Sequence, residues 1–468
     1  MNTPKKFLTC LGLVTCVALV GCGRKMSPEE AAYRLEPLAP SLGSCEEGAQ
    51  NCAQVMDCRD DKQPCLQRKI SVDVDACAKS DDRDKCQNLA DRLPEVSLVS
   101  DPYNLVSATF TTEPPEVELF SDDLRLPWDL EFLPDGTMLI TEKKGRVVAM
   151  DASGKALTAL QVSVIDTHEA GLMGLAIDPD FNSNRYVYLA YTYKLDDTDP
   201  AFAKPEQWNF QRVLNKIERW ELNDGLLENP LVLKDDIPGS IEHTGMRLEF
   251  GPDGKLYAST GDANTDVLSQ DIAFLGGKVL RMNPDGTVPD DNPIPGSYVY
   301  SRGHRNPQGL AWHPESGDLY TAEHGANRFD EINRIKPGAN YGWGSYECHR
   351  SLNVKPLSDT VEFPLLCFPT WNLSPSGSTF VNDKNSPWHG NFFVAGLRGR
   401  HLHRYAFDGD SVTLDEIFYV SDKWDYSLPG RKGKVGRRLR DVEYHAGALY
   451  VIGDKFGLVK LTPGKAQQ

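Results

Sequence analysis

The chain has 468 residues, with 50 Lys and Arg against 67 Asp and Glu, and a formal net charge of −17 at pH 7. This acidic balance argues against nucleic acid as a partner, because polyanions are bound by basic surfaces. The length exceeds one ordinary domain, although an all-β assembly can use most of it as a single unit. Neither a dinucleotide-binding or P-loop motif nor a GxSxG nucleophile motif occurs, which argues against nucleotide-dependent enzymes and α/β-hydrolases.

A positively charged start followed by an apolar run predicts an export signal over residues 1–21. Lys5 and Lys6 precede the run, which is too short to cross a bilayer comfortably but suits a signal peptide. The run ends Leu-Val-Gly-Cys and resembles the lipobox of bacterial lipoproteins, in which Cys22 becomes the acylated first residue. Ordinary cleavage nearby is the alternative. Because position 23 is not Asp, the resemblance implies a protein anchored to the outer membrane by its lipid alone and facing the periplasm.

The cysteines that remain after export predict disulfides, since the periplasm is oxidising. Of 11 cysteines, two lie in the signal and Cys22 is the lipid site, which leaves eight. The simplest interpretation joins Cys348 to Cys367 and places three disulfides in a small Cys-rich module and linker over residues 22–115. The module's cysteines are Cys45, Cys52, Cys58, Cys65, Cys77 and Cys86. A metal cluster is the alternative for these six, but they contain no CxxC pair and no histidine among them.

An internal repeat follows the module and predicts the fold class. A turn rich in Pro, Gly or Asn precedes a short run of large apolar residues six times, at residues 133–141, 178–191, 251–260, 313–322, 388–396 and 445–453. The spacing fits four-stranded blades with insertions. We therefore expect an all-β, six-bladed β-propeller over residues 116–464, with a strand near 117–120 closing the ring against the last blade. A pair of β-sandwiches is the alternative.

Polar residues before two of the expected strands predict a catalytic pair. His243 precedes the strand expected over residues 246–250, and Arg305 and Asn306 precede the one expected over residues 309–312 in the next blade. Equivalent positions in adjacent blades face the same mouth of a propeller, where loops from several blades build ligand sites. An imidazole can remove a proton from an alcohol, and a nearby guanidinium can stabilise the oxyanion. A purely structural histidine is the alternative.

Arginines near the C-terminus predict an anion pocket on this acidic chain. Arg398 lies in the segment LRGRHLHRY, and Arg438 and Arg440 alternate along one further expected strand. A guanidinium forms two parallel hydrogen bonds with a carboxylate, so the cluster suits a small polyanion. A solvated basic edge is the alternative.

Taken in order, the chain's motifs are characteristic of one family. They include LPWDLEFLPDG, HTGMRLEFGPDGKLYASTGD, GHRNPQGLAWHP, EHG followed by DEIN, NYGW, and LRGRHLHR with LRDV. Over about residues 124–461 the sequence resembles the soluble quinoprotein aldose dehydrogenases of the glucose/sorbosone dehydrogenase family, which are six-bladed propellers that bind pyrroloquinoline quinone (PQQ) and calcium. The resemblance implies that His243 is the base for the sugar C1 hydroxyl, and that Arg305 and Asn306 contact the quinone oxygens.

The resemblance also implies two ligand sets. Arg398, Arg438 and Arg440 match the positions that hold the PQQ carboxylates, Asp330 matches an acid beside the cofactor, and Glu169 stands where many relatives have Gln. Backbone carbonyls of Gly325 and Ala326 match the ligands of the calcium under the quinone, and Glu331 and Tyr341 match a second, structural calcium site.

The sequence thus predicts a PQQ- and calcium-dependent enzyme that oxidises an aldose or related alcohol to its lactone or carbonyl product, with an electron acceptor that the sequence does not identify. A non-catalytic envelope propeller that binds a protein or glycan is the alternative. Glu169 would place an additional negative charge beside an anionic cofactor, and the bulk of Arg328 and Phe329, where relatives have small residues, could narrow the mouth.

Overall fold

The computed structural model describes residues 115–166, 168–194, 213–326, 329–348, 350–352, 357, 360–368, 373–418, 420, 438–454 and 457–464. The predicted signal peptide, Cys22 and the Cys-rich module lie outside these residues, so lipid anchoring, localisation and the module's disulfides stay predictions. No helix in the described part combines the length and the apolar character that a membrane span requires.

The described strands form six four-stranded antiparallel sheets, which we call blades 1 to 6, and one two-stranded ribbon. Blade 1 contains β2 (Pro127–Phe132), β3 (Met138–Glu142), β4 (Arg146–Met150) and β5 (Ala156–Gln161). Blade 2 contains β6 (Leu172–Ile177), β7 (Tyr186–Lys194), β8 (Val213–Asn223) and β9 (Leu226–Pro238), with the short helix α5 (Phe181–Asn184) before β7. Blade 3 contains β10 (Gly245–Phe250), β11 (Leu256–Thr260), β12 (Lys278–Met282) and β13 (Val299–Arg302), with the 3-10 helix η6 (Asp266–Gln270).

The remaining blades follow the same order. Blade 4 contains β14 (Pro307–Trp312), β15 (Leu319–Glu323), β16 (Asp330–Ile335) and β19 (Leu366–Phe368), and the ribbon of β17 (Tyr346–Glu347) and β18 (Arg350–Ser351) is inserted before β19. Blade 5 contains β20 (Pro375–Phe380), β21 (Phe392–Gly396), β22 (Leu402–Asp408) and β23 (Ser411–Phe418). Blade 6 contains β24 (Leu439–His445), β25 (Ala448–Gly453), β26 (Gly457–Thr462) and β1 (Glu116–Ser121).

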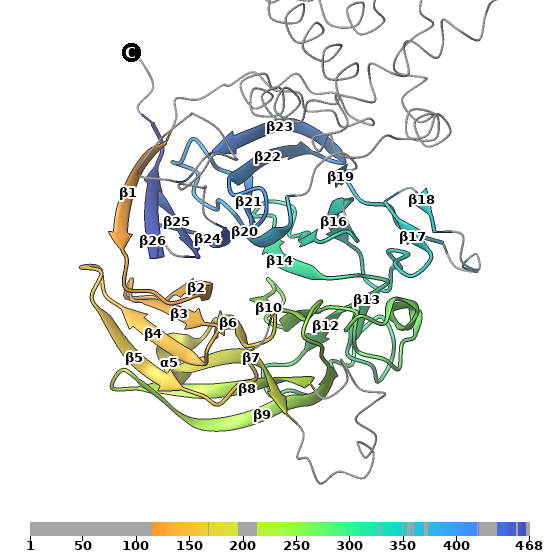
Figure 1. The fold of residues 1–468 in the computed structure, drawn as a ribbon, viewed down its shortest axis with the longest axis horizontal. Coiled ribbons are helices and arrows are strands. Elements are labelled where there is room, and N and C mark those ends of the chain that lie inside the picture. Colours follow the sequence, from red (N-terminus) through yellow and green to blue (C-terminus); the bar gives the residue numbers. More distant parts are fainter. Residues whose placement is uncertain are drawn as a thin grey trace, which may run out of the picture. The chain divides into compact units, whose positions relative to one another are not determined.

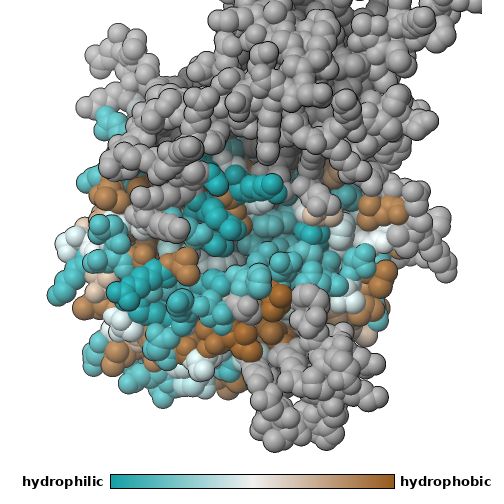
Figure 2. Space-filling view, in the orientation of Figure 1, coloured by the Kyte–Doolittle hydropathy of each residue, from teal (hydrophilic) through white to brown (hydrophobic). Residues whose placement is uncertain are grey.

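The blades are arranged in a ring, which confirms the predicted six-bladed propeller (Figure 1). The first strand of each blade lies innermost, and β2, β6, β10, β14, β20 and β24 contact one another in turn around the centre. The ring closes where β1 pairs with β26, with Val117 opposite Leu461, so the closing strand was correctly predicted. In the view of Figure 2, hydrophilic residues gather towards the centre of the propeller face.

Local turn chemistry explains why the repeat in the sequence forms hairpins. In blades 1 and 3 the turn between the first two strands contains Pro-Asp-Gly, and the glycines Gly136 and Gly254 adopt φ values of 86° and 69° that favour glycine. The Asp135 carboxylate accepts a hydrogen bond from the Thr137 amide at 2.9 Å. Apolar side chains on both faces of the second strands are buried because neighbouring blades cover both sides, as in β11.

The meander topology brings distant loops to one end of the ring. Successive strands of a blade run in opposite directions, so the segment before the first strand and the loop between the second and third strands lie at the same end. We call this end of the propeller the first mouth. The predicted strand over residues 309–312 corresponds to β14, which begins at Pro307, and Arg305 and Asn306 directly precede it. Arg438, predicted inside a strand with Arg440, instead lies one residue before β24.

Candidate active site

His243 and Arg305 face each other across blades 3 and 4 at the first mouth. The His243 Nε2 atom lies 2.8 Å from Arg305 Nη2, and a guanidinium has only donors, so Nε2 accepts this hydrogen bond. The other ring nitrogen, Nδ1, lies 2.7 Å from an Asp262 carboxylate oxygen. Arg305 also donates from Nη1 to the His324 carbonyl at 3.2 Å. The catalytic pair proposed from the sequence is therefore assembled, with one nitrogen of the imidazole facing a cation and the other an acid.

Asp262 was not predicted from the sequence, although it completes the contacts of His243. It follows β11, in a loop between second and third strands, so the meander places it at the first mouth. Gly261 allows the close approach, because a Cβ atom there would lie 1.8 Å from the His243 carbonyl oxygen. The Asp262 amide donates to the Arg305 carbonyl at 2.7 Å, and its second carboxylate oxygen accepts the Trp343 indole N–H at 2.7 Å.

A buried set of polar side chains holds the Arg305 loop in place. The His304 ring lies between Ser301 Oγ, 2.8 Å from Nε2, and Glu323 Oε2, 3.0 Å from Nδ1. The other Glu323 oxygen accepts the Arg305 backbone amide. None of these three side chains is accessible enough to meet a substrate, since His304 is fully buried and Ser301 and Glu323 are nearly so. They therefore orient the loop and do not form a hydrolytic triad open to a ligand.

Glu169 and Asn306 tie three blades together beneath the catalytic pair. One Glu169 oxygen, Oε2, accepts the His243 amide at 2.8 Å, Asn306 Nδ2 at 3.1 Å and Gln308 Nε2 at 3.5 Å. Asn306 also accepts the Gly245 amide on its own Oδ1 at 3.0 Å. The half-buried Glu169 carboxylate thus accepts hydrogen bonds from three donors within the propeller, which compensate for its partial removal from water.

The predicted basic cluster also belongs to the first mouth. Arg440 donates twice to Asp454, from Nε at 2.9 Å and Nη2 at 3.1 Å, and Arg438 Nε lies 3.7 Å from the same carboxylate. Partial burial, together with the positive charge of Arg440, lowers the pKa of Arg438, on which Glu169 also acts electrostatically. Arg398 is exposed, in the loop between β21 and β22. One acid therefore serves two guanidinium groups, and the surplus positive charge faces a mouth shared with His243.

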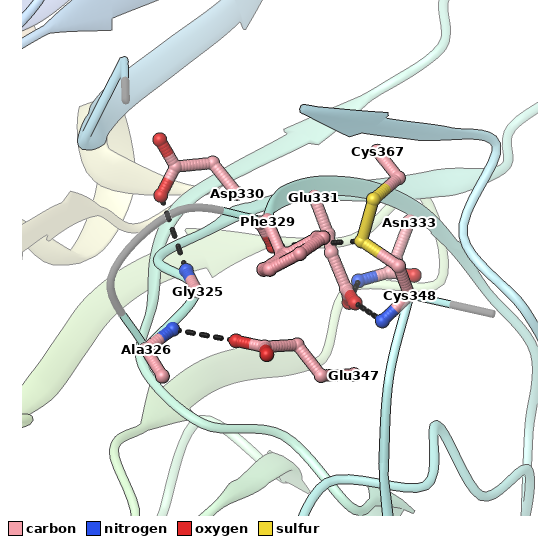
Figure 3. Close-up of a disulfide and its surroundings, with 9 residues drawn as sticks. All are labelled: Gly325, Ala326, Phe329, Asp330, Glu331, Asn333, Glu347, Cys348 and Cys367. Carbon is pink, nitrogen blue, oxygen red and sulfur yellow. Dashed lines mark hydrogen bonds between the residues drawn. A yellow bond between two sulfur atoms is a disulfide. The ribbon is translucent and has the colours of Figure 1, made fainter. Parts of the chain in front are cut away.

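Two carboxylates hold the backbone amides of the loop after β15 (Figure 3). The Gly325 amide donates to Asp330 Oδ1 at 3.1 Å, and the Ala326 amide donates to Glu347 Oε1 at 2.7 Å. Asp330 uses its other oxygen to accept the Ser374 amide at 2.8 Å, and burial raises the pKa of Asp330 to about 6. Asp330 therefore connects the backbone of this loop with the segment before β20 of blade 5.

The residues predicted for a second calcium site make separate contacts. Glu331 accepts the Cys348 amide and Asn333 Nδ2, and burial, followed by the charge of Glu323, raises the pKa of Glu331 to about 8. The Tyr341 hydroxyl donates to the Arg334 carbonyl at 2.6 Å. Within the described residues no three His, Cys, Asp or Glu side chains converge as a metal-ligand set. The second calcium site accordingly stays a prediction.

Cys348 and Cys367 form a disulfide beside the same loop, with their Cα atoms 5.8 Å apart (Figure 3). Cys367 lies in β19, paired with Glu331 of β16, so the bridge fixes the inserted ribbon to the edge of blade 4. Glu347, the neighbour of Cys348, is the acceptor for the Ala326 amide. The disulfide thus lies one residue away from the group that orients the Ala326 peptide.

Comparisons with known proteins identify the family of the chain. The sequence profile of the family described as Glucose / Sorbosone dehydrogenase matches residues 124–459. Aldose sugar dehydrogenase YliI of Escherichia coli is 31% identical over 370 residues, which cover 74% of this chain and 92% of that protein. Quinoprotein glucose dehydrogenase B of Acinetobacter calcoaceticus is 31% identical over 340 residues, which cover 64% of this chain and 67% of that protein.

Solved structures give the same assignment. The PQQ-bound form of the aldose sugar dehydrogenase from Streptomyces coelicolor superimposes with a TM-score of 0.60 at 30% identity, covering 75% of this chain and 100% of that one. The apo form of the soluble aldose sugar dehydrogenase from Escherichia coli superimposes with a TM-score of 0.64 at 28% identity, again covering 75% of this chain and 100% of that one. The chain therefore belongs to the glucose/sorbosone dehydrogenase family.

Proposed function

We propose that this protein catalyses the PQQ- and calcium-dependent oxidation of an aldose or related alcohol to the lactone or carbonyl product. The observation that carries the proposal is the contact between His243 Nε2 and Arg305 Nη2, which are 2.8 Å apart at the first mouth. These two groups can share one alcohol oxygen, because the imidazole accepts the proton and the guanidinium stabilises the negative charge that develops. The names of the similar dehydrogenases support the same reaction class.

The residues of the first mouth fit a quinone that carries carboxylates. Arg398, Arg438 and Arg440 would hold the carboxylates. Arg438 and Arg440 share one acid, Asp454, so the cluster keeps a net positive charge. Arg305 Nε and Gln308 Oε1 are buried and lack a hydrogen-bond partner among the described residues, so they are available to a bound molecule. When bound, PQQ would supply an electrophilic quinone that accepts the hydride from the sugar carbon.

The loop after β15 fits a hard cation. The amides of Gly325 and Ala326 are engaged by Asp330 and Glu347, whereas no described group donates a hydrogen bond to either carbonyl oxygen. Calcium prefers oxygen ligands of this kind, including backbone carbonyls. These two carbonyls would ligate the ion, whose positive charge would also offset Glu169 and polarise a quinone oxygen.

His243 and Arg305 would have different roles at the hydroxyl group of the substrate. The sugar hydroxyl displaces Arg305 from His243 Nε2 and transfers its proton to that nitrogen while the carbon loses hydride. Asp262 keeps the proton of the neutral ring on Nδ1, which leaves the lone pair of Nε2 directed at the substrate. An aldose that loses one proton and one hydride at C1 becomes a lactone, so protons and electrons balance.

The test is reconstitution of the purified protein with PQQ and calcium, followed by dye reduction with a panel of aldoses. His243→Ala should lower kcat by at least roughly 100-fold, the contribution expected of a general base. His313→Ala is the matched control, because His313 follows β14 at the opposite mouth. Lack of turnover on every aldose, together with lack of PQQ binding in a thermal-shift titration, would sink the proposal and favour a non-catalytic binding propeller.

A further inference from the structure

The turn Asn340–Trp343 brings an aromatic residue into the catalytic site. The Trp343 amide donates to the Gly303 carbonyl at 2.9 Å, which ties the turn to the loop that carries Arg305. Its own carbonyl accepts Ser269 Oγ at 2.8 Å and Gln270 Nε2 at 2.9 Å, both from η6 of blade 3. Trp343 is therefore fixed by its backbone to the two blades that supply His243 and Arg305.

The Trp343 side chain contacts both halves of the catalytic pair. Its indole N–H donates to Asp262 Oδ2 at 2.7 Å, and Asp262 Oδ1 is the partner of His243 Nδ1. The Arg305 guanidinium lies over the Trp343 ring, 5.3 Å from the centroid, within the range of a cation–π interaction. Four side chains consequently form a closed circuit in which each contacts the next.

Within this circuit, Trp343 supplies the donor that fixes the rotation of the Asp262 carboxylate. Asp262 is 1% exposed, and Oδ1 already accepts His243 Nδ1 and the Asn264 amide, the latter at 2.8 Å. Among the described residues Trp343 is the hydrogen-bond donor to Oδ2. If that N–H were lost, a buried carboxylate oxygen would lack a partner, which favours rotation of the group. Rotation releases His243 Nδ1.

We infer that Trp343 is a positioning residue for proton removal: it holds Asp262 so that His243 keeps its proton on Nδ1 and its lone pair on Nε2. This inference rests on the proposed function. An indole N–H neither gains nor loses a proton near neutral pH, so it remains a hydrogen-bond donor to Asp262. The ring face meanwhile keeps Arg305 beside the same nitrogen.

Trp343→Phe separates the two contacts, because phenylalanine keeps an aromatic face for Arg305 and lacks the N–H. With PQQ and calcium bound, kcat should fall roughly 10- to 100-fold, as is usual for partners that orient an active imidazole, while KM changes little. Trp312→Phe is the matched control, since the Trp312 indole N–H is buried without a hydrogen-bond partner in the described part of the chain. In an Asp262→Asn background, Trp343→Phe should have no further effect, because both changes act through one carboxylate.

A second readout does not depend on turnover. Nitrogen-15 NMR of the apo protein reports which ring nitrogen of His243 carries the proton, with His243→Ala identifying the signals. The wild type and Trp312→Phe should show one tautomer, protonated on Nδ1, and Trp343→Phe should show a mixture. An inactive wild type with this NMR difference would refute the proposed function alone. An active wild type in which Trp343→Phe matches Trp312→Phe in rate and tautomer would overturn the inference.

Discussion

Among single residues, Asp262 determines what His243 can do. In the neutral imidazole, Nδ1 carries the proton because its partner is the Asp262 carboxylate. Nε2 accepts a hydrogen bond because its partner is the Arg305 guanidinium. The acid is almost fully buried, and its two oxygens accept from different donors. In the proposed reaction, these contacts would leave Nε2 as the nitrogen that receives the proton.

Asp262→Asn is expected to lower kcat severely with little effect on cofactor binding. An amide can donate to Nδ1, which forces the proton of the ring onto Nε2 and removes the base. The equivalent change in a triad whose histidine is oriented by an aspartate costs on the order of 10⁴-fold, and we expect a loss approaching that size. Steady-state kinetics and a PQQ thermal-shift titration would measure the two quantities. Asp266→Asn, an exposed acid nearby in η6, is the control, and a variant at position 262 that stays within a few-fold of wild type would contradict the assignment.

The proximity of His243 and Arg305 could be predicted from sequence, whereas the residues that contact them could not. His243 and Arg305 stand at matching positions before two strands of a repeat, so the repeat itself places them at one mouth. The contact of Trp343 with Asp262 joins residues 81 positions apart, and although the meander places Asp262 at the first mouth, no repeat places Trp343 beside it. The depth of a loop and the rotamer of an indole decide such contacts, and local sequence carries no signal for either.

At the scale of elements, the ribbon of β17 and β18 is an insertion that contacts the loop after β15. Glu347 of β17 accepts the Ala326 amide, and Cys348 directly follows it and is bridged to β19. The pairing of the two cysteines was predicted by counting, because they are the pair outside the N-terminal group. The role of the ribbon was not predictable, since two-residue strands leave no periodicity in the sequence.

Removal of this disulfide should destabilise the propeller and weaken its response to calcium. The bridge spans a separation of 19 residues, and closing a loop of that size is worth about 3 kcal/mol in the unfolded-chain entropy model. In the double variant Cys348→Ser, Cys367→Ser, we expect a lower melting temperature and a smaller rise on adding calcium, because Glu347 loses its anchor. Differential scanning calorimetry at several calcium concentrations would measure both. An unchanged calcium response, with only the stability reduced, would show that the ribbon does not act on the loop.

For the whole molecule, ion pairs connect the innermost strands of three blades. Arg247 of β10 forms ion pairs with Asp129 of β2 and with Asp441 of β24, the latter at 3.1 Å, which links three blades across the axis. A glycine in β20 leaves room, because a Cβ atom at Gly377 would lie 1.6 Å from Asp441 Oδ1. The repeat predicted the number of blades, but these charges sit at alternate positions of strands that look ordinary in sequence. Only closure of the ring brings them together.

The same inner strands are expected to make stability depend on pH through Glu249, which lies two residues after Arg247 on β10. Burial, followed by the charge of Asp129, raises the pKa of Glu249 to about 8 from an ordinary value of 4.5. Burial and neighbouring carboxylates also raise the pKa values of Glu131 and Glu443. Between pH 4.5 and about 8 the folded protein therefore binds more protons than the unfolded chain, and its free energy of unfolding falls as pH rises.

Glu249→Gln should remove part of this dependence, because an amide keeps the shape of a protonated carboxyl group and cannot ionise. The stabilisation from protonated Glu249 is complete below the pKa of this group in the unfolded chain and is lost as pH rises through about 8. Each unit by which the folded pKa exceeds the unfolded pKa contributes about 1.4 kcal/mol. Melting temperatures at pH 5, 7 and 9 should fall less steeply for the variant than for the wild type, with the largest gap at pH 9. Glu228→Gln, an exposed carboxylate on β9, should follow the wild-type curve. If Glu249→Gln also followed the wild-type curve, Glu249 would be ionised in the folded protein, and Arg247 would have to form an ion pair with it as well.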